Sequence, residues 1–134
     1  MGSINCYIPN RSGDKIEIDM IMLCQKGIYV KENKNYSGWI FGDEKSKNWC
    51  EILKGKKYFF YNPIKQNKSH IKNLEKQLQV GDDKYVSLIT FNANANLKKV
   101  STESLGIYVF LLFLITEFSP RQKLLIYIFY FFIN

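Results

Sequence analysis

The chain has 134 residues, enough for one domain with a hydrophobic core but too few for two. It carries 19 Lys and Arg against 12 Asp and Glu, and 17 of the basic and 11 of the acidic side chains lie in the first 104 residues. This basic region is compatible with a polyanionic partner, because contacts to phosphates release condensed counterions. A lysine-rich composition is common, so it favours nucleic acid only weakly.

The use of cysteine and histidine excludes several kinds of site. Cys6, Cys24 and Cys50 are odd in number, and no two of them form a Cys-x-x-Cys pair. They indicate reduced thiols and argue against a disulfide framework or a zinc site. His70 is the only histidine, which disfavours a histidine-rich metal site and a Ser-His-Asp triad. The N-terminal residues lack the apolar core of a signal peptide, so we predict a cytoplasmic protein.

Hydrophobic periodicity predicts several strands and one helix. Residues 1–15 are polar and rich in turn formers, so we predict an irregular N-terminal segment. Alternating apolar residues and β-forming composition predict strands at 16–23, 27–34, 84–91 and 97–102, a short strand or bulge within 35–42, and a hairpin around Gly55. No internal repeat is visible in the sequence.

One helix is predicted from Pro63 to about Gln79. Asn62 is a good N-cap, and Pro63 fits the first helical position, where its missing N–H costs nothing. Gly81 lies just beyond the predicted end. Gln66 and His70 are four residues apart, so they share neighbouring positions on one helix face. The side chains on that face either point into solvent or reach a functional site.

Residues 105–134 differ in composition from the rest of the chain. They hold 9 of the 21 aromatic residues, in two apolar blocks separated by "EFSPRQK". A membrane-spanning helix needs about 20 apolar residues, and neither block is that long. Three interpretations stay open: a membrane-associated end, two very hydrophobic core strands or helices, or the product of a shifted reading frame in an AT-rich gene.

Acidic side chains and a lysine lie on the first two predicted strands. If residues 25–26 form the tip of a hairpin, Asp19 lies opposite Glu32; if residues 26–27 form it, Asp19 lies opposite Lys34. In both registers the period of two puts Glu17, Asp19, Glu32 and Lys34 on one sheet face. A three-residue loop would move Glu32 and Lys34 to the other face.

This arrangement suits metal-assisted hydrolysis of a phosphodiester bond. Two carboxylates that lie within about 5 Å repel each other unless a cation lies between them. Mg²⁺ prefers one or two carboxylates, waters and phosphate oxygens. A lysine on the same face can orient or help deprotonate the attacking water and stabilise the developing charge. The plain alternative is an ordinary cross-strand salt bridge, because Glu-x-Lys is frequent in lysine-rich chains.

Three blocks in order resemble the nuclease-related domain of many bacterial proteins. The first two blocks lie within "IEIDMIMLCQKGIYVKENKNYSGWIFGDEKSKNWCE", and the third opens the helix in "FFYNPIKQNKSHIKNL". The resemblance covers residues 4–102 and implies membership of the PD-(D/E)xK nuclease superfamily. It implies an α/β, restriction-endonuclease-like fold, with a mixed central sheet, an antiparallel hairpin core and a flanking helix.

The resemblance also implies roles for particular residues. Asp19 and Glu32 would bind Mg²⁺ or Mn²⁺, Glu32 and Lys34 would be the acid and lysine of the (D/E)xK motif, and Gln66 would reach back to the site from the helix. The implied substrate is nucleic acid, and DNA is the expected form. By contrast, we expect the aromatic residues in 36–41 (Tyr36, Trp39 and Phe41) to pack in the core or against the sheet rather than to stack on bases.

The sequence departs from the family pattern at both ends. The family normally begins with a helix that contributes a glutamate to the site, and no such helix precedes residue 16 here. We therefore predict a partial nuclease-related domain at 1–104 and an apolar, aromatic-rich tail at 105–134. Two alternatives to a metal-dependent nuclease stay open: an inactive remnant that binds nucleic acid, and a small protein that contacts the membrane through residues 105–134.

Overall fold

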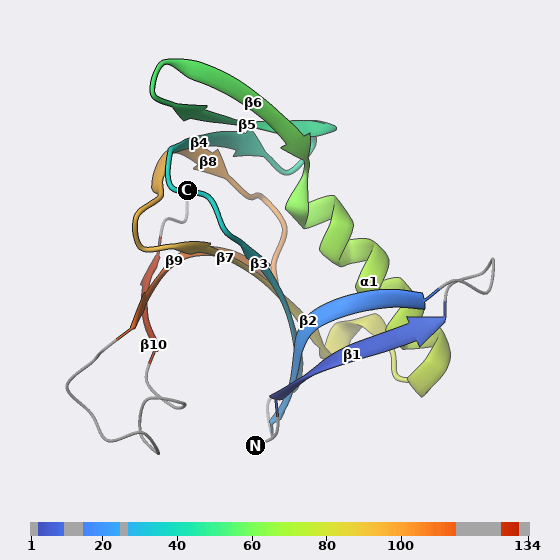
Figure 1. The fold of residues 1–134 in the computed structure, drawn as a ribbon. Coiled ribbons are helices and arrows are strands. Elements are labelled where there is room, and N and C mark those ends of the chain that lie inside the picture. Colours follow the sequence, from blue (N-terminus) through green and yellow to red (C-terminus); the bar gives the residue numbers. More distant parts are fainter. Residues whose placement is uncertain (1–2, 10–14, 25–26, 115–126, 132–134) are drawn as a thin grey trace.

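The structure, a computed structural model, describes residues 3–9, 15–24, 27–114 and 127–131, which form two β-sheets and a long helix (Figure 1). The elements are β1 (Ser3–Pro9), β2 (Lys15–Cys24), β3 (Gly27–Lys34), β4 (Trp39–Asp43), β5 (Asn48–Leu53), β6 (Lys56–Tyr61), α1 (Pro63–Leu78), a short 3₁₀ helix η1 (Asp82–Lys84), β7 (Tyr85–Asn92), β8 (Asn96–Ser101), β9 (Ile107–Leu114) and β10 (Tyr127–Phe131).

The larger sheet is mixed, with the strand order β1-β2-β3-β7-β9-β10. Strands β1, β2 and β3 pair antiparallel, β3, β7 and β9 pair parallel, and β10 returns antiparallel to β9. Parallel neighbours need a long crossover. Between β3 and β7 this crossover contains β4, β5, β6 and α1. The predicted mixed sheet with an antiparallel hairpin and a flanking helix is confirmed, and it is a restriction-endonuclease-like arrangement.

The prediction of an irregular N-terminal segment was wrong for residues 3–9. These residues form β1, which pairs with β2 along its outer edge. In sequence, Ile4, Cys6 and Ile8 alternate with other residues, a period typical of a strand, but the neighbouring Asn and Pro residues suggested a turn. Pairing with β2 outweighs the low β-propensity of these residues.

The smaller sheet has the strand order β6-β5-β4-β8. The turn between β5 and β6 contains Lys54 and Gly55, both with positive φ (50° and 76°), as a tight hairpin turn requires. The predicted hairpin around Gly55 is therefore confirmed. The register between β4 and β8 shifts between Ile40 and Phe41, which confirms the predicted irregularity in this segment.

Helix α1 begins and ends close to the predicted residues. The Asn62 side chain accepts a hydrogen bond from the N–H of Ile64 at 2.9 Å, and Pro63 is the first helical residue. Gln79 ends the helix in the left-handed conformation, and its N–H donates to the carbonyl of Glu75 at 2.8 Å. The left-handed terminator is thus Gln79 and not Gly81.

The core lies between the larger sheet on one side and α1 with the smaller sheet on the other. Its main cluster joins both sheets and the start of α1: Ile40, Trp49, Ile64, Ile89, Phe91, Ala95, Leu97, Ile107, Val109 and Leu111. A second cluster lies along the later turns of α1, where Leu74 packs with Ile18, Val30 and Tyr85. Full burial of one such aliphatic side chain stabilises the fold by about 1.5–3 kcal/mol.

Trp49 holds the two sheets together. Its ring stacks on Phe91 of β7, with centroids 6.2 Å apart, and its Nε1–H donates to the carbonyl of Asp43 at 2.8 Å. A Cβ atom at Gly42 would lie 2.2 Å from the Trp49 ring. Glycine at position 42 is therefore what allows β4 to approach the indole this closely.

The first part of the predicted tail belongs to the larger sheet. In β9, Ile107, Val109 and Leu111 are buried in the main cluster. Residues 107–114 thus correspond to the core-strand interpretation, while the division at residue 104 stays a prediction. No helix in the described ranges is long and apolar enough to cross a membrane. Residues 115–126 and 132–134 lie outside the described residues.

Glu44 ties the β4–β5 turn to the segment before β9. Its Oε2 accepts the N–H groups of Glu103 (2.8 Å) and Ser104 (3.0 Å), and its Oε1 accepts from Lys68 Nζ (3.2 Å) and from the Ser104 hydroxyl. Burial alone would raise the pKa of Glu44, but the hydrogen bonds from Ser104, Glu103 and Lys68 lower it to about 2.

This pKa predicts a pH-dependent contribution to stability. Because it lies below the ordinary value of 4.5, the carboxylate stabilises the fold above about pH 4.5, and this stability is lost as the pH falls towards 2. We expect Glu44→Gln to lower the free energy of unfolding by roughly 1–2 kcal/mol near neutral pH. The difference from the parent chain should disappear near pH 2. Urea unfolding of both proteins across this range measures it.

Glu103→Gln is the matched control, because the Glu103 side chain forms only an exposed ion pair with Lys45. It removes an acid from the same loop while leaving the backbone N–H that Glu44 binds. A difference between Glu44→Gln and the parent that stays constant from neutral to acid pH would contradict the prediction.

Candidate active site

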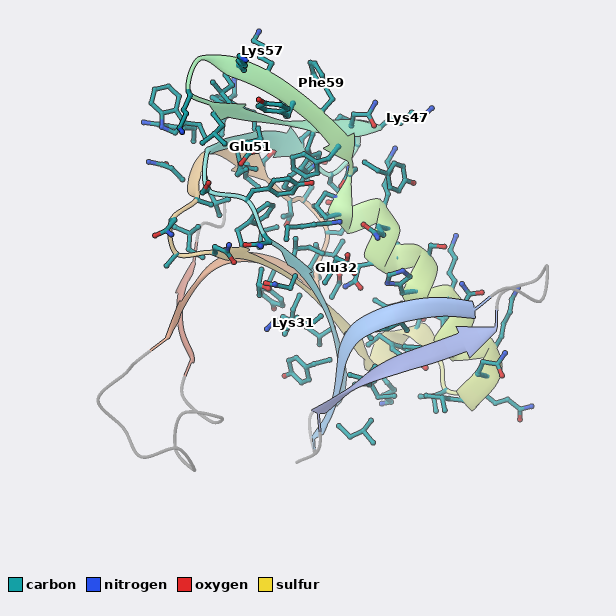
Figure 2. All side chains as sticks on the ribbon, in the orientation of Figure 1. Lys31, Glu32, Lys47, Glu51, Lys57 and Phe59 are labelled. Atoms are coloured by element: carbon teal, nitrogen blue, oxygen red, sulfur yellow. The ribbon has the colours of Figure 1, made fainter. Side chains whose placement is uncertain are left out.

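The (D/E)xK acid and lysine lie at the end of β3 that faces the first turns of α1. Figure 2 shows Glu32 on the helix side of β3 and Lys31 on the opposite side of the sheet. Period-two alternation puts Lys34 on the same face as Glu32. Gln66 and His70 approach this face from α1, so two pairs of side chains from segments far apart in sequence converge.

The distances define one connected polar group. Lys34 Nζ lies 3.3 Å from Glu32 Oε1 and donates a hydrogen bond to Gln66 Oε1 at 2.9 Å. His70 Nδ1 lies 3.7 Å from the other carboxylate oxygen, Glu32 Oε2. The structure therefore brings together Glu32, Lys34 and Gln66 as predicted from the sequence.

Burial strengthens the electrostatic interaction between Glu32 and Lys34, because little water screens it. The Glu32 side chain is only 7% exposed and Lys34 only 19%. A carboxylate with so little water is costly unless a cation or hydrogen-bond donors compensate its charge. Lys34 supplies that compensation here. Removing Lys34 would take a positive charge away from the buried Glu32 carboxylate, so we expect this pair to contribute to folding.

Two buried asparagines fix α1, one against β3 and the other against the turn between β4 and β5. Asn67 Nδ2 donates to the carbonyl of Val30 at 2.8 Å and to Ser87 Oγ at 2.7 Å. Asn62 Nδ2 donates to the carbonyls of residues 43, 44 and 46, at 3.0, 3.1 and 2.7 Å. These contacts set the height and rotation of α1, and hence which of its side chains meet Glu32.

Asp19 lies on β2, next to β3, at an irregular point of the ladder. The pairing of β2 with β3 runs from Cys24↔Gly27 to Met20↔Lys31, which confirms the first of the two predicted registers. Asp19 is the next residue along β2, as Glu32 is along β3. The side chain of Asp19 lies outside the described part of the structure, so its predicted role stays a prediction.

A β-bulge occurs at this position. On β1, Ile4 pairs with Ile21 and Cys6 pairs with Ile18, so one residue of β1 opposes both Asp19 and Met20. The alternation along β2 is therefore interrupted, and Ile18 and Ile21, three residues apart, both pack in the cluster on α1. The shared face of residues 17, 19, 32 and 34 stays a prediction, because the side chains of residues 17 and 19 lie outside the described part of the structure.

His70 is the residue of the site that the sequence prediction left out. The sequence showed only that it lies four residues after Gln66 on one helix face. That spacing was the available signal, but the alternative of a solvated face explained it equally well. The structure shows that His70 is buried beside Glu32. Among the described residues, no three His, Cys, Asp or Glu side chains form a metal-binding group.

A mixed sheet with an acid and a lysine two residues apart on a strand, buried under a helix, defines a class of nuclease-like α/β domains. Residues 4–92 match the family model of the nuclease-related domain, and the chain belongs to this family. An uncharacterized protein of Bacillus anthracis is 36% identical over 104 residues, 75% of this chain and 47% of that protein. This chain thus spans about half the length of that curated relative. No solved structure matches this chain.

The family assignment confirms the resemblance of the three sequence blocks. It places this chain among the nuclease-related domains. The matched range ends at residue 92, within the predicted range of 4–102.

The asparagine at the helix start gives a test of how the site is assembled. Asn62→Ala removes the N-cap and leaves three loop carbonyls without their donor, so we expect a loss of about 3 kcal/mol in the free energy of unfolding. Asn73→Ala is the control, because its amide makes one exposed bond to the Ser69 carbonyl. Urea unfolding compares the two variants, and equal losses would contradict this role of Asn62.

Proposed function

We propose that this chain is a metal-dependent nuclease that hydrolyses DNA phosphodiester bonds at Asp19, Glu32 and Lys34. The observation that carries this proposal is the position of Lys34, whose ammonium lies between Glu32 and Gln66 on a largely buried face. A plain surface salt bridge needs neither the burial nor a second partner from a helix 32 residues away.

The donor set on this face suits a hard divalent cation. Glu32 offers carboxylate oxygens, and Asp19 is the corresponding acid on the adjacent strand. Mg²⁺ and Mn²⁺ accept one or two protein carboxylates and fill their remaining positions with waters and phosphate oxygens. Asp19 and Glu32 would hold the cation, which when bound supplies polarisation of the phosphate and acidification of water.

Lys34 would stabilise charge and orient water. Its Nζ donates to Gln66 and faces the Glu32 carboxylate. One of its N–H groups donates to Gln66, and the ammonium can also donate to a phosphate oxygen or to the attacking water. A fixed positive charge at this point stabilises the negative charge that develops on the phosphorane.

Gln66 acts through Lys34 and is a positioning residue. Its Oε1 accepts the ammonium hydrogen bond and restricts the long, flexible lysine side chain to one direction. The buried His70 lies beside Glu32 Oε2 and limits the access of water to the carboxylate. In this way α1 contributes orientation while β3 contributes the reacting groups.

Plasmid cleavage by the purified chain tests the proposal. We expect supercoiled or linear DNA to be cut with Mg²⁺ or Mn²⁺ and not with EDTA. Asp19→Asn and Lys34→Ala should each reduce the rate by at least about 100-fold, because each removes a group that acts on the transition state. Gln66→Ala should reduce it by about tenfold, since it only loosens the lysine.

Exposed residues of the same helix provide controls. Gln77→Ala and Lys76→Ala remove side chains of the same types outside the site and should leave cleavage unchanged. Circular dichroism and urea unfolding establish that each variant is folded. Cleavage that needs no metal, or that survives in both Asp19→Asn and Lys34→Ala, would refute the proposal. DNA binding without any cleavage would favour an inactive remnant instead.

A further inference from the structure

The outer face of the smaller sheet exposes large aromatic side chains. Phe59 is 71% exposed, Trp39 is 50% exposed and Tyr61 is 49% exposed. We expected Tyr36, Trp39 and Phe41 to pack in the core or against the sheet; Tyr36 packs against the main cluster, whereas Trp39 is half exposed. Single exposed aromatics are common, whereas several on one sheet surface indicate a binding face.

The strand registers place these rings on the same face. Phe59 pairs with Cys50, which pairs with Phe41, so one row crosses three strands. A parallel row contains Trp39, Ile52 and Lys57, and Tyr61 lies two residues beyond Phe59 on β6. The residues between them, such as Phe60 and Trp49, point inward to the core. Trp39, Phe41, Phe59 and Tyr61 together are the outer aromatic face.

Several lysines lie beside these aromatic rings, and few carboxylates do. Lys57 lies in the Trp39 row, Lys98 Nζ lies 4.5 Å from the centre of the Trp39 ring, and Lys99 pairs with Phe41. Figure 2 shows Lys57 and Phe59 projecting outward from β6, with Glu51 on the inner side of the sheet. Glu51 is buried, and its Oε2 accepts the N–H groups of residues 37 and 38.

The four strands of the smaller sheet contain two acidic residues in the described structure, Glu51 and Asp43. Glu51 faces inward, so Asp43 is the carboxylate on the side of the outer aromatic face. Its Oδ1 accepts the backbone N–H groups of Lys45 and Ser46, both at 2.8 Å. These hydrogen bonds occupy it locally and lower its pKa. The outer aromatic face is therefore basic, and its charge is complementary to phosphate.

We propose that the outer aromatic face binds single-stranded nucleic acid. Bases would stack on Trp39, Phe59 and Tyr61, while Lys57 and Lys98 contact phosphates. A duplex keeps its bases stacked inside, so it offers no ring faces to a flat aromatic surface. A protein partner would need apolar or acidic side chains to match rings surrounded by lysines. This inference deepens the proposed function, because it names single strands as the class of nucleic acid that is held.

Strand β6 supplies matched controls for a binding experiment. Tyr58 is 48% exposed but lies on the opposite face from Phe59, and Lys56 lies on the opposite face from Lys57. Fluorescence anisotropy of a labelled single-stranded oligonucleotide of about 15 nucleotides is measured in EDTA, so that no cleavage occurs. We expect Phe59→Ala to weaken binding about tenfold, and Tyr58→Ala to leave it unchanged.

Two further measurements test the same face: oligonucleotide binding by lysine-to-glutamate variants, and the accessibility of Trp39 to a quencher. Lys57→Glu should weaken binding and reduce its salt dependence more than Lys56→Glu does. Bound oligonucleotide should protect Trp39 from acrylamide quenching, since the other tryptophan, Trp49, is buried. This protected signal should be absent in Trp39→Phe.

Binding in EDTA separates this inference from the proposed nuclease activity. Selective loss of binding in Phe59→Ala and Lys57→Glu supports it even if the parent chain cuts nothing. Equal effects of Phe59→Ala and Tyr58→Ala, or no single-strand binding beside metal-dependent cutting, would overturn it. It would also be overturned if Phe59→Ala abolished dimerisation in analytical ultracentrifugation without changing affinity for the oligonucleotide, because the occupant would then be a second copy.

Discussion

The docking of α1 onto β3 is the constraint on which the candidate site depends. Two fully buried side-chain amides hold the helix in place: Asn67 donates to the carbonyl of Val30 in β3, and Asn62 at the helix start donates to carbonyls of the turn after β4. A purely apolar helix face can slide or rotate at little cost, whereas buried amides lose hydrogen bonds when the helix moves. The pairing of Gln66 with Lys34 therefore follows from contacts that involve neither residue.

The site itself conflicts with stability, and the surrounding fold compensates for the conflict. Glu32 follows Val30 on a buried strand face and pairs in the sheet with Ile89, an environment that favours an apolar side chain. The charge persists there because Lys34 and α1 compensate for the lost water. Such a local violation of the hydrophobic pattern is typical of functional sites, where chemistry outweighs packing.

The sequence predicted the elements whose signals are local. The strands and hairpin follow from alternation and from Gly55, and the helix follows from Asn62 and Pro63, because capping and turn geometry depend on neighbouring residues. The bulge at Asp19 and Met20 depends on how β1 pairs with β2, which no local pattern records. The role of His70 likewise depends on helix docking. Residues 107–111 suggested several interpretations because an apolar run fits a core strand, a helix or a membrane segment equally well.

The two functional surfaces are linked by one junction in the chain. Tyr61 ends β6 on the outer aromatic face, and the next residue, Asn62, begins the helix that presents Gln66 to Lys34. Between them there is no flexible linker, since the Asn62 N–H donates to the carbonyl of Lys47 and its side chain caps the helix. A nucleic acid strand held on β6 would thus be held on an element rigidly connected to the helix that contacts Lys34. Rigid connection converts binding energy into orientation, which is the contribution that a nuclease with few reacting groups needs most.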